Sequence, residues 1–404
     1  MKIGEKASQL LQLDLCDHCL GRQFAQLGHG LENHQRGKIV RKHGEKLKEK
    51  HFEERPESSI GGSCDYCQGI FDRLDEYVEM VMDSMERYEL ETFLVGIRPP
   101  ETVLKKEEDL WEEHGLEYTE PIKTELSRLI GKQVEEEMDV EVDFERPDIM
   151  TVLDMREGKN RVELQVNSLL FYGEYNKYTR KLPQTEWPCS ECGGSGCDEC
   201  NWTGQQFEGS IQEIIQKPFI EATGAIDAKF HGAGREDIDV ECRGRRPFVI
   251  ELREPLERTV DLEKIQEKIN EDERVEVFNL EETHHNRPEE VKDLDADKTY
   301  RAWIQLEDLD SAELEKLEDL EGTVVQRTPS RVEHRRADKH RERKVKKVDW
   351  KTEEGLVVLD VKAEAGTYIK ELIHGDDGRS DPSVAGLLGQ DAECVKLDVI
   401  EIDS

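Results

Sequence analysis

The sequence predicts an α+β fold, with a mixed or antiparallel sheet and flanking helices in the carboxyl-terminal half and a smaller α/β region before it. From about residue 206 onward, runs of alternating apolar and polar residues dominate, and that period is typical of half-buried strands. Between residues 71 and 185, segments with helical apolar spacing alternate with strand-like runs. Four CxxC pairs, which hold eight of the ten cysteines, predict that metal ions organise two further segments.

The chain has 404 residues, enough for two or three domains with a sizeable core. It contains no apolar run long enough to cross a bilayer, and its first residues, MKIGEKASQL, lack the apolar core of a secretion signal. We therefore expect a cytoplasmic protein with no membrane partner. In that reducing compartment, paired cysteines are more often metal ligands than disulfides.

Residues 1–70 are predicted to form a zinc-binding module. Helical apolar spacing surrounds the first CxxC pair, a basic helix is expected over residues 37–50, and the second pair lies in a turn. Four thiolates from two such turns would close a tetrahedral, structural zinc site. Two unrelated reduced pairs are the alternative, and His18 or His29 could replace a thiolate. The proposed ligands are Cys16, Cys19, Cys64 and Cys67.

Residues 71–185 are predicted to form an accessory α/β domain. A helix is expected over residues 75–89, a strand over 92–99, an acidic helix from Glu107, and strands within 139–155 and 161–178.

Residues 186–205 carry a second, compact cysteine cluster with the spacing CxxC-x4-CxxC, in which several glycines allow tight turns. The segment resembles one unit of the cysteine-rich region of DnaJ-type chaperones, and a compact zinc knuckle is expected. A redox pair or a metal-free site is the alternative. The proposed ligands are Cys189, Cys192, Cys197 and Cys200.

The remaining residues, 206–404, contain a glycine-rich turn that presents a carboxylate between two strands. In the run HGAGREDIDVECRGRRP, Gly232 and Gly234 interrupt the strand pattern just before Asp237. Asp239, two residues further on, is the rival carboxylate, and a solvated surface acid is the alternative for both. Helices are expected at about 260–272, 310–318 and 368–374.

The formal net charge of −36 argues against nucleic-acid binding if it is taken as one number, because phosphates repel acidic groups. Residues 327–347, however, hold ten Lys or Arg against three acidic residues, a local balance of +7. A basic stripe of this kind is typical of an RNA contact, and a solvated basic surface is the alternative. The remaining acidic charge is expected to cover a solvated surface, as in proteins of salt-loving organisms.

Four ordered segments resemble the archaeal and eukaryotic family of pseudouridine synthases that modifies the T-loop of tRNA at positions 54 and 55. They are GRED with GRRPF around Asp237, KTYRAWI at 298–304, QRTPSRVEHRR at 326–336 and AGTYIKELIHGDDGRSDPSVAGLLG at 365–389. The resemblance implies a pseudouridine synthase catalytic domain over 206–404 and a THUMP-like RNA-binding domain over 71–185.

The resemblance also implies the roles of individual residues. Asp237 would be the catalytic carboxylate, as nucleophile or as base, and Lys370 would be the charge partner that keeps it ionised. Tyr300 would stack on the extruded uracil and could take a proton late in the reaction. Leu387 or Leu388 would wall the pocket. The expected substrate-binding residues are Arg235, Tyr368, Arg327, Arg331, Arg335 and Arg336.

The predicted function is therefore isomerisation of uridine to pseudouridine in the T-loop of tRNA. The reaction would need no cofactor, nucleotide or otherwise, beyond one or two structural zinc ions, and the enzyme is expected to act as a monomer. A zinc-dependent RNA-binding or assembly protein without catalysis is the alternative from another functional class. A DnaJ-like cochaperone is disfavoured, because further CxxCxGxG units are missing from the sequence.

Overall fold

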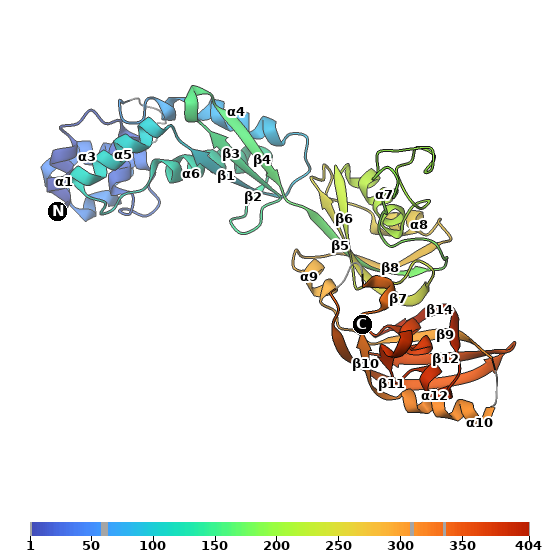
Figure 1. The fold of residues 1–404 in the computed structure, drawn as a ribbon. Helices are drawn as coiled ribbons and strands as arrows, with labels where there is room; N and C mark the ends of the chain where they lie inside the picture. The colour runs from blue at the N-terminus through green and yellow to red at the C-terminus, as the bar shows by residue number, and fades with distance from the viewer. Residues whose placement is uncertain (1, 58–63, 308–310, 334–336, 404) are drawn as a thin grey trace. The chain divides into compact units, whose positions relative to one another are not determined.

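The structure is a computed structural model, and it describes residues 2–57, 64–307, 311–333 and 337–403 (Figure 1). The chain divides into two compact units. The first comprises the residues up to Ser168 together with Leu256–Arg258, and the second comprises Leu169–Pro255 with the residues from Thr259 onward. None of the described helices is long and apolar enough to span a membrane.

The first unit begins with a helical module built around α1 (Ile3–Leu10), α2 (Asp17–Gly21) and α3 (Asn33–His43). The backbones of α2 and α3 touch, because a Cβ added at Gly21 would lie 1.7 Å from the carbonyl oxygen of Asn33. The basic helix expected over residues 37–50 ends at His43, since Gly44 takes a positive φ of 50° that a helix cannot continue.

A four-stranded sheet follows in the same unit, in the order β2-β1-β3-β4. The strands β2, β1 and β3 run parallel, and β4 is antiparallel to β3. Alternate residues of β1 are buried, as the period of a half-buried strand predicts. The elements are α4 (Leu74–Met85), β1 (Thr92–Arg98), α5 (Glu101–His114), α6 (Ile122–Met138), β2 (Glu141–Val142), β3 (Ile149–Asp154) and β4 (Arg161–Val166).

The second unit is organised by a ten-stranded sheet in the order β13-β10-β11-β12-β9-β14-β7-β5-β8, with β6 paired to β7. Among the described residues, β14 and β7 pair in parallel, and the other pairs are antiparallel. The strands are β5 (Leu169–Lys177), β6 (Asp227–Gly232), β7 (Glu241–Arg253), β8 (Val275–Glu282), β9 (Lys298–Leu306), β10 (Gly322–Arg327), β11 (His340–Glu353), β12 (Leu356–Ala363), β13 (Ser380–Asp381) and β14 (Ala392–Ile402).

Helices flank this sheet, as expected, and the three predicted ones are present as α8, α10 and α11. Two hydrophobic cores lie against it, one around β9, β12 and β14 and the other around β5, α7 and α8. Together the two units confirm the predicted α+β class. The helices are α7 (Ile211–Thr223), α8 (Leu262–Ile269), α9 (Arg287–Lys292), α10 (Ser311–Leu314), α11 (Ile369–His374) and α12 (Val384–Leu388).

The sheet begins upstream of residue 206, where the sequence pattern placed the start of the catalytic domain. Strand β5 lies between β7 and β8 and pairs with both, so residues 169–177 are an inner part of the sheet. The second cysteine cluster therefore lies in the loop between β5 and α7. An antiparallel β-bridge between Pro188 and Gln205 joins the two ends of the segment that carries the cysteines.

Candidate active site and metal centres

The turn that carries Asp237 connects β6 to β7 and rests on a buried polar network. The Nε of Arg246 lies 2.9 Å from the Oε2 of Glu236, and both side chains are at most 2% exposed. The hydroxyl of Tyr175 donates to the Glu236 carboxylate at 3.2 Å, and Nη1 of Arg246 donates to the carbonyl of Ala233 at 2.7 Å. The turn is therefore anchored to β5 and β7 from within the protein.

The carboxylate of Asp237 is partly exposed and faces two cations. Nη1 of Arg331 lies 3.3 Å from its Oδ2, and Nζ of Lys370 lies 3.5 Å from the same oxygen. Lys370 is closer to Asp239, at 2.8 Å. Burial alone would raise the pKa of the Asp239 carboxyl, but the hydrogen bond and charge of Lys370 outweigh it and hold that pKa below its ordinary value. The expected charge partner thus reaches both acids.

Arg331, which was expected to contact phosphate, also pairs with two carboxylates of the protein. Its Nε donates to Oε1 of the buried Glu371 on α11 at 2.7 Å, while its other end reaches Asp237. The guanidinium therefore bridges two carboxylates. Sequence reasoning placed Arg331 in the basic segment but gave no signal for this pairing, because Glu371 lies 40 residues away in the chain.

Tyr300 lies on β9, partly buried against the core around β12 and β14. Desolvation raises the pKa of its phenol to about 12, although the charge of Arg246 acts in the opposite direction. The phenol is therefore neutral at physiological pH and presents an uncharged ring to the cavity beside it.

A cavity of about 810 Å³ brings most of these side chains together. Four sequence segments that were singled out separately contribute to its lining, and the volume suits a nucleotide. Among the expected site residues, the lining includes Arg235, Asp237, Tyr300, Arg331, Tyr368 and Lys370.

Three further arginines line the cavity: Arg246, which supports the turn as described above, and Arg341 and Arg343, which the sequence placed only within the basic stripe. Arg341 and Arg343 alternate along β11, so their side chains share a face of the strand, and both line the cavity. The guanidinium of Arg341 lies 6.0 Å from the ring centroid of Tyr368. The i, i+2 spacing of two arginines within a strand-like run was the signal that could have identified them.

The other expected site residues lie elsewhere. Arg327 is absent from the cavity lining in the described part of the chain and pairs with Asp338, with its Nε 2.8 Å from Oδ2. Leu387 and Leu388 pack against the core around β9 and β12 and are likewise absent from the described lining. Arg335 and Arg336 lie outside the described residues.

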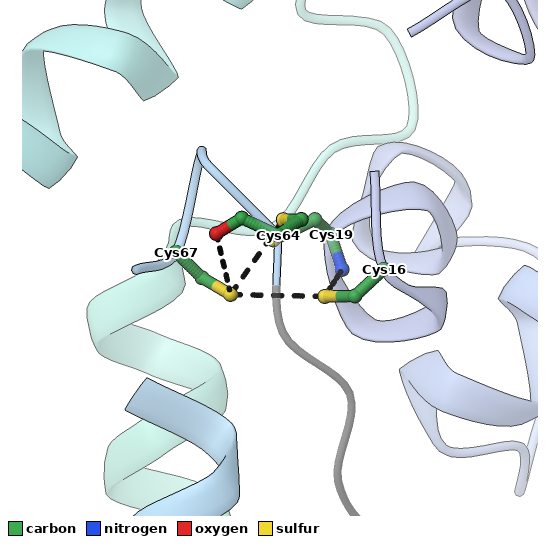
Figure 2. Close-up of side chains that lie close together, drawn as sticks. All are labelled: Cys16, Cys19, Cys64 and Cys67. Atoms are coloured by element: carbon green, nitrogen blue, oxygen red, sulfur yellow. Dashed lines mark hydrogen bonds between the residues drawn. The ribbon is translucent and has the colours of Figure 1, made fainter. Parts of the chain in front are cut away.

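The first cysteine cluster is fully assembled and buried (Figure 2). Its four sulfur atoms lie within 4.8 Å of one another, with 3.7 Å between Cys16 and Cys67 and 3.6 Å between Cys64 and Cys67. Nη1 of the buried Arg22 donates to the sulfur of Cys19 at 3.2 Å. Two CxxC turns that are 44 residues apart in sequence therefore form one closed set of four ligands that can hold a metal ion.

The second cluster also brings four sulfur atoms within 4.8 Å, but two of its cysteines are only partly buried. Backbone N–H groups point at the sulfurs: those of Cys197 and Gly204 donate to Cys200 at 3.2 and 3.3 Å. Burial would raise the pKa of the Cys200 thiol, but these hydrogen bonds and those from neighbouring thiols lower it below its ordinary value. Cys200 therefore favours the thiolate form, and the four sulfurs of the cluster can hold a second metal ion.

Two protein-family models match this chain, and one of them covers all the segments that line the cavity. The family model described as "Pus10, C-terminal" matches residues 170–403, and the model "Pus10 THUMP domain, archaeal" matches residues 77–154. The first match begins one residue after the start of β5, in accord with the place of that strand in the sheet.

Curated relatives match over nearly the whole chain. A protein named tRNA pseudouridine synthase Pus10 from Methanothermobacter marburgensis is 42% identical over 100% of this chain and 99% of its own length. Proteins of the same name from Halorubrum lacusprofundi and Methanocaldococcus jannaschii are each 40% identical, over 96% and 97% of this chain and 93% of their own lengths. The chain is therefore a member of the Pus10 family.

Proposed function

We propose that this protein is a tRNA pseudouridine synthase that isomerises uridine in the T-loop of tRNA, at positions 54 and 55, with Asp237 as its catalytic carboxylate. One observation carries the site assignment: Asp237 faces Arg331 and Lys370 in the same cavity that Tyr300 lines. The names of the relatives support tRNA as the substrate.

The cavity offers what the isomerisation requires. The bond between the ribose C1′ and the uracil nitrogen N1 breaks, the base turns, and a bond from C1′ to the ring carbon C5 forms. C5 then loses its proton and N1 gains one, so that the net change is an isomerisation. Asp237 acts at the ribose, as nucleophile or as base, and the two cations keep it ionised. We assign Tyr300 to stacking on the base, because its ring lines the same cavity as Asp237. No external oxidant or reductant enters this balance.

Binding must also offset the cost of extruding the nucleotide, about a few kcal/mol. We assign phosphate contacts to three of the arginines that line the cavity, Arg235, Arg341 and Arg343. Because these arginines cluster at the cavity, they attract the phosphates of RNA there, although the chain as a whole has a net charge of −36. We assign RNA binding also to the THUMP domain, which the family model matches at residues 77–154. Residues 169–177, which the sequence pattern placed in that domain, belong instead to the sheet of the second unit.

Both cysteine clusters are proposed to hold zinc. Four sulfur donors within 4.8 Å suit the tetrahedral preference of that ion, and a site closed by four thiolates leaves no position for a reactive water. The metal would supply folding energy to the segments around it and takes no part in the isomerisation.

The decisive experiment replaces Asp237 by Asn and compares it with the matched variant Asp239→Asn. An unmodified tRNA transcript is incubated with each enzyme, and pseudouridine is mapped along the RNA. We expect no product from Asp237→Asn with tRNA binding near normal, and residual activity from Asp239→Asn.

Product from Asp237→Asn would refute the site assignment, and wild-type modification outside positions 54 and 55 would refute the target. If the wild type binds tRNA without turnover, the non-catalytic zinc-dependent RNA-binding protein becomes the better description.

A further inference from the structure

A fully buried lysine lies directly beneath the turn that carries Asp237. Lys177 ends β5 and is 0% exposed. Its Nζ donates to the carbonyl oxygens of Leu182 at 3.0 Å, Ile238 at 3.1 Å and Asp237 at 3.5 Å. The three protons of the ammonium group thus have three acceptors, and two of these belong to the turn.

Stability alone does not favour an ammonium group at this position. Removing a charge from water costs several kcal/mol, and the three hydrogen bonds described above go from Lys177 to neutral carbonyls rather than to a carboxylate. Desolvation lowers the pKa of Lys177, although the charges of Glu236 and Asp239 act in the opposite direction. The chain keeps a costly group where an apolar side chain would fill the same space.

The residues that follow Lys177 hold the same turn at further points. Nη1 of Arg180 donates to the carbonyl of Asp239, and the backbone N–H of Lys181 donates to that of Ile238 at 2.9 Å. Nε2 of Gln184 donates to the carbonyl of Gly234 at 2.9 Å. The segment 177–184 therefore binds carbonyl groups on both sides of Asp237, and Lys177 binds the carbonyl of Asp237 itself.

We propose that Lys177 is a positioning residue for the isomerisation: its ammonium group fixes the carbonyls of Asp237 and Ile238 and thereby aims the Asp237 carboxylate at the cavity. This inference rests on the proposed function of Asp237. Holding two successive carbonyls restricts the backbone torsions on either side of the reactive side chain. A misplacement of about 1 Å at a reacting group can cost about 100-fold in rate.

The test replaces Lys177 by Met, which keeps the length of the side chain and removes the ammonium group. Single-turnover rates are measured with full-length enzyme in excess over an unmodified tRNA transcript. We expect the maximal rate constant to fall about 10- to 100-fold, while the enzyme concentration at half-maximal rate stays within about twofold. Lys229→Met is the matched control, because that lysine is exposed on β6 and does not line the cavity in the described part of the chain. Its maximal rate constant should equal that of the wild type.

A structural role would give a different result. Loss of folded protein lowers the active fraction and raises the half-maximal concentration, but it leaves the maximal rate constant unchanged. An unchanged maximal rate constant in Lys177→Met would therefore overturn the inference. If that variant does not fold, Lys177→Gln takes its place, since the glutamine side chain keeps N–H donors. Its maximal rate constant should then fall about 3- to 10-fold. A maximal rate constant equal to that of the wild type would overturn the inference.

Asp237→Asn is measured in parallel so that the two proposals can be separated. If Asp237→Asn is active, the catalytic assignment and this inference fail together. If Asp237→Asn is inactive while Lys177→Met reacts at the wild-type rate, the inference alone fails.

Discussion

Arg331 joins the carboxylate of Asp237 to the buried carboxylate of Glu371, and the two contacts have separable consequences. Its Nε pairs with the buried Glu371, and its Nη1 lies 3.3 Å from Asp237. Replacing Arg331 by Met leaves Glu371 without this partner, which costs about 1–3 kcal/mol of unfolding free energy. It also removes one of the two cations near Asp237, so we expect the maximal single-turnover rate constant to fall at least about 10-fold.

The double variant Arg331→Met/Glu371→Gln separates the two effects. A neutral amide relieves the charge of the buried carboxylate, so urea denaturation should show most of the lost stability restored. The rate constant should stay low, because Asp237 still lacks the guanidinium. Recovery of the rate in the double variant would mean that Arg331 acts only by stabilising α11.

His34 predicts a pH dependence for the first unit. This side chain is buried on α3, and desolvation, together with the charge of His18, lowers the pKa of His34 to about 4. Because the folded pKa lies below that of the unfolded chain, the neutral ring contributes full stability above about pH 6.5. That contribution is lost as the pH falls from 6.5 toward 4.

Between pH 7 and pH 5.5 the loss amounts to about 1 kcal/mol of unfolding free energy for this one group. Urea denaturation at the two pH values measures it. The decrease in unfolding free energy between the two pH values should be about 1 kcal/mol smaller in His34→Gln than in the wild type, whatever the absolute stability of the variant. In His29→Gln, which alters an exposed histidine, this decrease should equal that of the wild type. Equal pH dependence in the wild type and His34→Gln would contradict the prediction.

At the scale of the elements, short sequence motifs were enough to predict which segments contribute side chains to the candidate site. Asp237, Tyr300 and Lys370 were predicted from three separate segments, and β9, α11 and the turn before β7 bring them to the lining of one cavity. Their exact pairing was not predictable, since Lys370 lies nearer to Asp239 than to Asp237.

The support for the turn could not be predicted, because it depends on strand pairing between distant segments. Tyr175 and Lys177 lie about 60 residues before Asp237, and they reach the turn because β5 pairs with β7. The run LLFYGEYNK gave one usable signal. It reads as a strand that is apolar throughout much of its length, and Lys177 is a charged residue at its buried end.

The two cysteine clusters predict two rates of metal release. The first cluster lies within the core of its unit, whereas two cysteines of the knuckle are partly exposed. With an excess of chelator, metal should leave the knuckle in a fast phase and the first cluster in a slow phase that accompanies unfolding of the helical module. A colorimetric chelator together with the circular dichroism signal measures both.

Cysteine variants assign the two phases. Cys197→Ser should abolish the fast phase and lower the metal content from two ions per chain to one, with little loss of helix signal. Cys19→Ser should abolish the slow phase and destabilise the first unit. A single phase in the wild type, or two bound ions in either variant, would refute the assignment of one metal to each cluster.

At the scale of the whole molecule, electrostatic interactions oppose folding but favour the binding of RNA. A net charge of −36 over 404 residues destabilises a compact state through self-repulsion. The cavity, in contrast, gathers arginines and lysines from the turn before β7, from β11 and from α11, and their attraction for phosphate depends on weak screening. Added salt should therefore strengthen the fold while it weakens the hold on RNA.

This opposition predicts different salt dependences for stability and for substrate binding. Since the screening length falls from about 10 Å at 0.1 M salt to about 3 Å at 1 M, the urea midpoint should rise steadily with KCl over that range. The enzyme concentration at half-maximal single-turnover rate should rise over the same range, as phosphate contacts weaken. The maximal rate constant should change little, because Arg331 and Lys370 each lie within 3.5 Å of the Asp237 carboxylate, a separation that is close to the screening length even at 1 M salt. Sucrose, which stabilises by exclusion without screening charge, is the control: it should raise the urea midpoint and leave RNA binding unchanged. A urea midpoint that is constant from 0.1 to 1 M KCl would mean that the acidic charge is too dispersed to strain the fold.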